Sequence, residues 1–232
     1  MSKPMARKRS ATKSAERSVR KRRSIGRPPA GQQTVGRDAL IARTCQMMMQ
    51  MPANKITRAE VARHMNVDPS LIRYYFRDRT TLLLAAAEKL TDEFMQMLEQ
   101  EHSHADTTAV GRLRARVSTL LNLNVAYPFF HRLLMDELVN IDSPSAKRFL
   151  ENLVKRGFNG YSSILDSGIR DGVFKRVNPA FLFLAIIGMC EFLVSGIPIL
   201  RIALGKDLDE RGISTRYRDF ICDLLIEGLK TR

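Results

Sequence analysis

The stretch Thr57 to Phe76, TRAEVARHMNVDPSLIRYYF, is the most informative part of the sequence. It predicts two short helices joined by a tight turn. Thr57 and Glu60 have the T-x-x-E spacing in which each side chain satisfies a free backbone N–H group at a helix start. Val61 and Ala62 then fall on one face of the first helix.

The second helix of this stretch has an equally clear start. Asn66 and Val67 form the predicted turn. Asp68 is a good N-cap, and Pro69 suits the first helical position, where no N–H donor is needed. The second helix therefore runs from about Pro69 to Tyr75.

The faces of this second helix suggest its use. Ile72 and Phe76 are expected to be buried, which leaves Ser70, Arg73 and Tyr74 facing outward. Two short helices with polar, Arg and Tyr side chains on the second form a helix-turn-helix, whose second helix can enter a DNA major groove. The alternative is an ordinary helical hairpin in an all-helical core.

The charge of the chain supports a polyanionic partner. The 232 residues carry a formal net charge of +14. Residues 1–30 hold 11 Lys or Arg and one acid, so that the remaining 202 residues carry only +4. A basic segment of this kind favours nucleic acid or an anionic surface as a partner.

Residues 1–32 are expected to be a disordered basic arm, because they contain almost no large apolar side chains. Gly26-Arg27-Pro28, flanked by basic residues, resembles half of an AT-hook, which lays Arg27 into a narrow minor groove. The alternative is a non-specific tail that gathers phosphate contacts. Either way, the arm should raise affinity more than specificity.

The rest of the chain is helical in pattern, and no credible strand is found, so the predicted fold class is all-α. The expected buried stripes include Met49, Met97, Val125, Phe220 and Leu224. The expected helices span residues 34–51, 78–101, 110–125, 129–139, 143–172, 180–204 and 213–229. The helix 180–204 is apolar on nearly all sides and therefore needs cover on all faces.

Several other site classes find little support. His102-x-His104 does not share a helix face and is expected in a polar loop, so no metal site and no cofactor are predicted. Glu191 and Pro198 interrupt the most apolar stretch, so no membrane partner is expected. Three widely spaced cysteines are expected to be free thiols in a reducing cytoplasm. No catalytic triad, Cys-His pair or phosphate loop is found, which argues against an enzyme.

From about Gln33 to its end, the chain resembles the tetracycline-repressor (TetR) family of transcriptional regulators. The family's head follows T-x-x-x-I-A-x-x-x-G-V-S-x-x-x-L-Y-x-H-F-x-x-K-x-x-L. The corresponding positions here are Thr57, Val61, Ala62, Asn66, Val67, Asp68, Ile72, Arg73, Tyr75, Phe76, Arg79 and Leu82. Asn66 replaces the turn Gly, Arg73 a phosphate-contacting Tyr, Tyr75 a His and Arg79 a Lys. A weaker match covers 168–174 and Asn178-Pro179.

The resemblance implies a three-helix DNA-binding head over 33–94 and a helical ligand-binding and dimerisation domain over 95–232. It implies a cytoplasmic homodimer joined through the last two helices, with double-stranded operator DNA as a partner. The predicted base-reading residues are Ser70, Leu71 and Arg73, and the predicted phosphate contacts are Thr57, Arg58, Tyr74, Tyr75 and Arg79.

The resemblance also implies a pocket for an unknown small-molecule effector between residues 105 and 200. The candidate lining residues are Phe129, His131, Met135, Tyr161, Cys190 and Glu191, although core packing explains each of them as well. Glu191 stands out because a carboxylate in an apolar helix needs a partner. The predicted function is a repressor released by its effector. The alternative is a weakly specific architectural DNA-binding protein driven by the basic arm.

Overall fold

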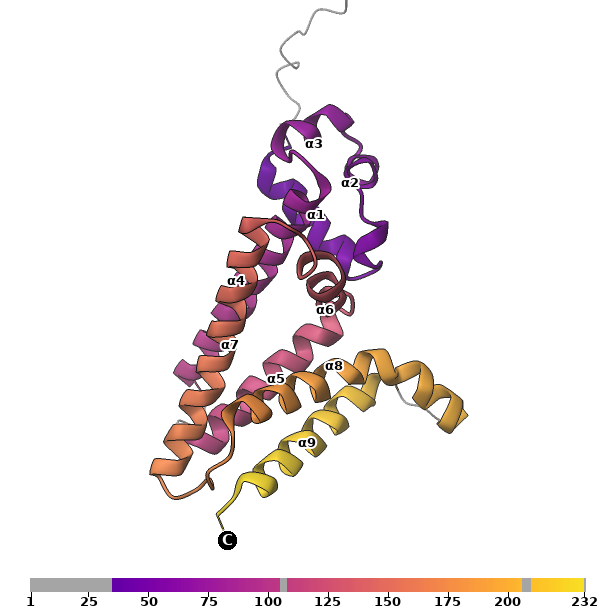
Figure 1. Cartoon of the computed structure of the whole chain (residues 1–232). Coiled ribbons are helices and arrows are strands. Elements are labelled where there is room, and N and C mark those ends of the chain that lie inside the picture. Colours follow the sequence, from indigo (N-terminus) through magenta and orange to yellow (C-terminus); the bar gives the residue numbers. More distant parts are fainter. Residues whose placement is uncertain (1–34, 105–107, 206–209, 232) are drawn as a thin grey trace, which may run out of the picture. The chain divides into compact units, whose positions relative to one another are not determined.

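The computed structural model describes residues 35–104, 108–205 and 210–231, and these residues are almost entirely helical (Figure 1). Within them, the only extended pairing is an isolated antiparallel bridge between Phe174 and Lys230. The all-α prediction is therefore confirmed. The elements are α1 (Arg37–Met48), the 3₁₀ turn η1 (Ala53–Lys55), α2 (Arg58–Met65), α3 (Pro69–Tyr75), α4 (Arg79–His104), α5 (Ala109–Ala126), α6 (Phe130–Arg132), the π-helix η2 (Leu133–Leu138), α7 (Pro144–Arg170), α8 (Pro179–Leu204) and α9 (Glu210–Leu229).

The helix-turn-helix forms as its sequence predicts. The Glu60 backbone N–H donates to Thr57 Oγ1 at 3.1 Å, which caps α2. Asn66 ends α2 in the left-handed region with φ 52°, a conformation that Asn tolerates better than most residues. The Ser70 N–H then donates to Asp68 Oδ1 at 2.7 Å, with Pro69 at the first position of α3.

The core of the head lies between α1, α2, α3 and the start of α4. Ile72 and Phe76 are fully buried there, as expected. The expectation for Met49 is wrong, because its side chain is 46% exposed whereas Met47 is only 2% exposed. The helix ends at Met48, so Met49 occupies the C-cap and turns away from the core.

Helix α4 leaves the head and continues into the rest of the chain. The Thr81 N–H donates to Asp78 Oδ1 at 2.7 Å, so Asp78 caps the start as predicted. The helix ends at His104 rather than near residue 101, so the loop expected around His102 is in fact its last turn. Met97 is 54% exposed and not part of the buried stripe, which Met95 and Leu98 supply instead.

No break in the backbone marks the expected domain boundary at residues 94 and 95, because α4 is continuous there. From Val35 onward the chain forms one compact unit. Its buried residues nevertheless form two clusters, and along α4 the first ends at Leu90 and the second begins at Phe94. The division into two domains stays a prediction.

Helix α5 is the centre of the second cluster and contacts α4, α7, α8 and α9. Ser143 and Asn178 cap α7 and α8 through their side-chain oxygens, each followed by a proline, as predicted. Val125 is 44% exposed and not buried, because it lies in the last turn of α5, where no other helix covers it. The three cysteines are buried free thiols.

Helices α8 and α9 each keep an uncovered apolar face. On α8 the exposed large apolar residues are Phe181, Leu184, Phe192, Ile199, Ile202 and Leu204. On α9 Phe220 and Leu224 are exposed, which corrects the expectation that both point inward. By length and composition alone, α8 is the one helix in the described part that could cross a membrane, with a mean hydropathy of 2.2. The core helix of a soluble protein passes the same test.

Candidate nucleic-acid interface and internal cavity

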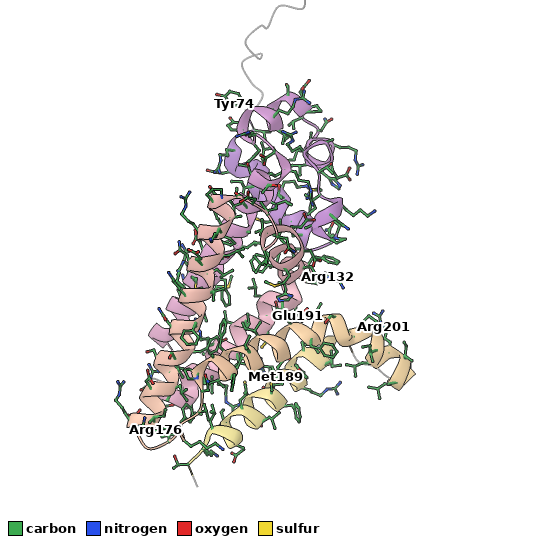
Figure 2. The ribbon with its side chains drawn as sticks, in the orientation of Figure 1. Tyr74, Arg132, Arg176, Met189, Glu191 and Arg201 are labelled. Carbon is green, nitrogen blue, oxygen red and sulfur yellow. The ribbon has the colours of Figure 1, made fainter. Side chains whose placement is uncertain are left out.

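The outer face of α3 presents the side chains expected to read DNA. Ser70, Arg73 and Tyr74 are exposed, and 81% of Tyr74 is accessible (Figure 2). Leu71 and Tyr75 are half-buried, and Tyr75 packs against the core of the head. Helix α3 is short, begins at a capped position directly after the turn, and presents Arg and Tyr side chains outward. These are the features of a recognition helix.

The two arginines expected to contact phosphate have partners within the chain. Arg58 Nη1 donates to the backbone carbonyls of Phe76 at 3.2 Å and Arg77 at 2.6 Å, which ties α2 to the end of α3. Arg79 Nε donates to the Ile56 carbonyl at 2.9 Å. Phosphate contacts by both residues stay predictions, in competition with these bonds.

Arg79 also forms a two-pronged ion pair with Glu137 of η2. Arg79 Nη1 and Nη2 lie 2.8 Å and 2.9 Å from the two carboxylate oxygens. These bonds hold the pKa of Glu137 below its ordinary value, against the opposing effect of partial burial. The pair joins the start of α4 and the turn before α2 to η2. Sequence analysis missed it because 58 residues separate the partners.

The other predicted DNA contacts have simpler positions. Thr57 is exposed and its hydroxyl serves as the α2 cap. Arg27 lies outside the described residues, as does the rest of the basic arm. These roles stay predictions.

A cavity of about 210 Å³ lies between the helices that follow the head and reaches the surface beside the exposed side chains of Met135, Val154 and Leu184. Its wall is mostly apolar, and helices α4 to α8 contribute to it, η2 included. The lining residues are Thr91, Phe94, Met95, Arg116, Leu120, Leu123, Asn124, Phe130, His131, Leu134, Met135, Leu150, Leu153, Val154, Gly157, Tyr161, Phe183, Leu184, Ile187 and Glu191.

Four of the six candidate ligand residues line this cavity, namely His131, Met135, Tyr161 and Glu191. Phe129 instead lines an adjoining pocket of about 270 Å³, which shares His131 and Glu191. Cys190 lines neither pocket. It faces α5, with its Sγ 3.9 Å from the Val117 carbonyl, because it lies on the buried side of α8.

The partner that Glu191 needs is a histidine of the same chain. Glu191 Oε1 lies 3.5 Å from His131 Nδ1, and both side chains are about one-third exposed at 29% and 35%. Glu191 therefore lies at the rim of the apolar wall and not deep within it (Figure 2).

The most unusual cavity residue is Arg116 of α5, which sequence analysis did not single out. Only 7% of it is exposed. Its guanidinium carbon lies 4.8 Å from the centre of the Tyr161 ring, and its Nη2 donates to the Gly157 carbonyl at 3.5 Å. Its Nε has no partner, and burial lowers the pKa of the guanidinium.

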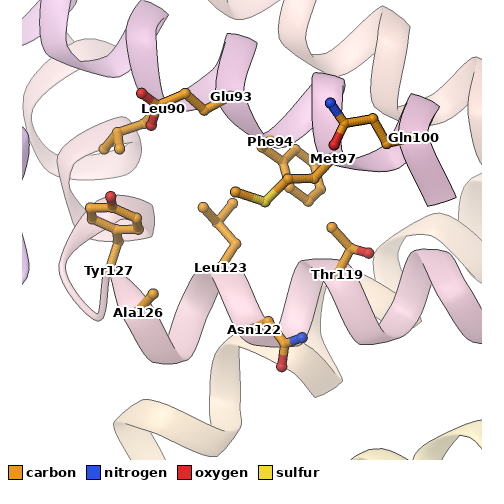
Figure 3. A pocket seen from close by; sticks show the side chains of 10 residues that line it. All are labelled: Leu90, Glu93, Phe94, Met97, Gln100, Thr119, Asn122, Leu123, Ala126 and Tyr127. Carbon is orange, nitrogen blue, oxygen red and sulfur yellow. The ribbon is translucent and has the colours of Figure 1, made fainter.

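A larger pocket of about 450 Å³ lies between α4 and α5. Figure 3 shows its lining, with Tyr127, Leu123 and Phe94 around the opening. Met97, Gln100 and Asn122 on its wall are exposed, so this pocket is a surface groove. Its wall holds one buried polar side chain, Thr119, and no buried charge, whereas the smaller cavity holds the buried cation Arg116. We therefore regard the smaller cavity as the stronger candidate for a ligand.

Within the described part of the chain, no three His, Cys, Asp or Glu side chains come together as metal ligands do. The side chains of His102 and His104 lie outside the described residues.

Comparisons with known proteins agree with this architecture. The HTH-type transcriptional regulator BetI of Escherichia coli is 31% identical over 91 residues, which cover 39% of this chain and 47% of that protein. The chain thus matches about half the length of this curated relative. Among solved structures, the ketosteroid transcriptional regulator KstR2 of Mycobacterium tuberculosis has a TM-score of 0.65 at 14% identity, covering 88% and 99% of the two chains.

A second solved structure is AibR in complex with isovaleryl coenzyme A and operator DNA. It has a TM-score of 0.64 at 13% identity, and the match covers 81% of this chain and 96% of that one. At these identities both structures support the fold alone. Residues 106–232, more than half of the chain, match the family model of the tetracyclin repressor-like C-terminal domain. The chain therefore belongs to the tetracycline-repressor family of transcriptional regulators.

Proposed function

We propose that this protein is a sequence-specific DNA-binding regulator, and that it acts as a repressor released from its operator by a small molecule. The observation that carries the proposal is the exposed face of α3, with Ser70, Arg73 and Tyr74 held by the Asp68 cap. An arginine on such a helix can pair with the O6 and N7 atoms of guanine through two hydrogen bonds. AibR, a protein of the same fold, is described as bound to operator DNA.

The uncovered apolar faces of α8 and α9 support a homodimer. Phe181, Leu184, Phe192, Ile199 and Ile202 follow one another at helical spacing along α8. Gly188 and Ser195 are also exposed and complete this stripe, which lets a second helix approach closely. A second copy would cover this face and place two recognition helices about one DNA turn apart, or a small multiple of that.

The contacts of η2 support a route from the cavity to the head. Leu134 and Met135 of η2 line the cavity, and Glu137 of the same segment binds Arg79. A ligand that moves η2 would therefore move an anchor of the head. The ligand can change the DNA affinity only if it binds one arrangement of η2 and the head more tightly than another. The difference between these two ligand affinities sets the size of the change.

The same proposal places the protein in the cytoplasm, with regulation and not catalysis as its role. Membership of a family of transcriptional regulators favours this function over the architectural alternative. The basic arm then adds affinity, through phosphate contacts or through minor-groove contact by Arg27.

The test is binding to the DNA immediately upstream of the protein's own gene, compared with a scrambled duplex of equal length at two salt concentrations. Both the full chain and a chain that begins at Gln33 are measured. A preference for the upstream DNA above a hundredfold in both chains supports a reader of sequence. Loss of all binding without residues 1–32, and no preference with them, would support the architectural alternative instead.

A further inference from the structure

Arg116 is a buried cation with no counterion in the described part of the chain. The carboxylate of Glu191 on the same cavity wall lies 3.5 Å from His131 Nδ1 and forms no ion pair with Arg116. The partners of the Arg116 guanidinium are the Gly157 carbonyl and the ring and hydroxyl of Tyr161, and none of them is a carboxylate. An arginine is not neutralised in proteins, and a buried charge without a partner is strongly unfavourable. Such a group calls for an explanation outside the packing of the core.

The neighbouring helix is shaped to admit this guanidinium. A Cβ atom placed on Gly160 of α7 would lie 2.3 Å from Arg116 Nη2, so the guanidinium could keep this position only beside a glycine. Gly157, one turn earlier, faces the ring of Phe183 at 3.3 Å. Glycine in a helix interior costs about 1 kcal/mol relative to alanine. The two glycines of α7 thus give up stability where the guanidinium and the Phe183 ring need room.

The rest of the cavity wall is chemically simple. Around Arg116 it consists mainly of apolar and aromatic side chains, including Phe94, Leu120 and Phe183. Thr91 Oγ1 is a second buried polar atom without a partner on this wall. The volume of about 210 Å³ is below the roughly 300–1,000 Å³ of pockets for drug-sized ligands. This volume favours a small occupant.

We propose that the cavity binds a small amphipathic monocarboxylate, with its carboxylate on the Arg116 guanidinium and its short apolar body against the aliphatic and aromatic wall. The carboxylate supplies the missing counterion, and bonds between charged partners of this kind are stronger than neutral ones. Arg116 would repel a cationic ligand, while a neutral one would leave the guanidinium without its counterion. The regulatory role of this binding rests on the proposed function, whereas the binding itself does not.

The probes are straight-chain monocarboxylates of four to ten carbons, with the amide and the amine of each chain length. Binding to the full-length protein is measured by calorimetry. We expect at least one carboxylate to bind at least tenfold more tightly than its amide, and the amine to bind most weakly. Arg116→Met keeps the length of the side chain and removes its charge, so this variant should lose the preference for the carboxylate.

The matched control is Arg114→Met on the same helix, since Arg114 is more exposed and binds Asp223 outside the cavity. This variant should keep the full preference. The thermal midpoint gives a second readout that does not depend on ligand. Without ligand, Arg116→Met should melt at or above the wild-type temperature, because it removes an uncompensated buried charge. With the best carboxylate bound, the wild type should melt at a higher temperature than Arg116→Met.

Equal binding of carboxylate and amide, failure of every carboxylate to bind, or an unchanged preference in Arg116→Met would each overturn the inference. The regulatory function is tested separately, by adding the best carboxylate to the complex with upstream DNA. Binding without release of DNA would uphold the cavity assignment and count against effector-controlled repression.

Discussion

The head and the helices that follow it differ in how completely the chain satisfies its own groups. In the head, the caps of α2 and α3 are made, Arg58 is bonded, and the large apolar side chains apart from Met49 and Tyr74 lie at least partly inward. In the second cluster, Arg116 is buried without a counterion, and whole faces of α8 and α9 remain apolar and exposed.

The difference separates two kinds of surface. The head needs its partner only on its outside, so its interior is closed by helix caps and by bonds from Arg58 and Arg79 to backbone carbonyls. The second cluster would meet a ligand inside its cavity and a second subunit on the outer faces of α8 and α9. Arg116 would gain a counterion from the ligand, and the apolar faces would be covered by the second subunit. The predictions below test this division.

The largest effect should come from the uncovered apolar faces. Phe192→Glu combined with Phe220→Glu places charges on both faces, so the dimer should dissociate at micromolar concentration. DNA affinity should fall more than a hundredfold, because each monomer holds one recognition helix. Analytical ultracentrifugation and DNA titration measure the two effects. The control is Met97→Glu, an equally exposed apolar site on α4, which should stay dimeric. A double variant that remains dimeric would assign these faces to another partner.

The next effect should come from the outside of the head. Arg73→Ala should weaken operator binding at least tenfold, about 1.4 kcal/mol, and relax the preference for sequence. Arg63→Ala on α2 is the control, because Arg63 is exposed but already paired with Glu60. Near-wild-type affinity and preference in Arg73→Ala would remove the assignment of this residue to base recognition.

A smaller effect is expected at the contact between the two regions. Glu137→Gln removes the negative charge that accepts the two hydrogen bonds from Arg79. It should lower the free energy of unfolding by about 1–3 kcal/mol. It should also reduce the response of DNA affinity to ligand. Asp136→Asn, an exposed neighbour, is the control. A loss of stability with an unchanged ligand response would leave the pair as a structural bond only.

The same pair has a defined pH dependence. Since the folded-state pKa of Glu137 is lowered, its contribution is fully present above the ordinary glutamate pKa of about 4.3. The contribution is lost as the pH falls through the lower folded-state value. The stability difference between wild type and Glu137→Gln should therefore be constant near neutral pH and shrink below about pH 4. A difference that grows in acid would contradict this assignment.

The smallest effects are expected from the loss of one helix cap in each region. Thr57→Ala removes the α2 cap and Asn178→Ala removes the α8 cap, and each should cost about 1 kcal/mol of stability. Only Thr57→Ala should also weaken DNA binding, because α2 supports the recognition helix. Denaturant titration and DNA titration separate the two outcomes, with Thr57→Ser as the variant that keeps the hydroxyl.

The parts of the structure that follow local rules were predictable from the sequence. Asp68-Pro69, Ser143-Pro144 and Asn178-Pro179 each start a helix where expected, because a cap and a proline act within a few residues. The helical period alone could not show which faces of α8 and α9 stay uncovered.

The contacts of the arginines were not predictable for a different reason. Arg58, Arg79 and Arg116 look alike in sequence, yet one braces the head, one bridges to η2 and one lies buried in the cavity. Their partners are carbonyls and side chains that are distant along the chain. The available signal for Arg116 was Gly160 in α7, which marks a point where another group approaches the helix closely.

The π-helix η2 sets the directions in which Met135 points toward the cavity and Glu137 points toward the head. Its wide turn, seen in the Val139 N–H bond to the Leu134 carbonyl at 2.9 Å, amounts to one residue inserted into an α-helix. Deleting one residue there would let the turn tighten and rotate one side of the segment by about 100° relative to the other. Met135 and Glu137 could then not both keep their present directions. The extra residue thus acts as a spacer that lets Met135 line the cavity while Glu137 bonds Arg79.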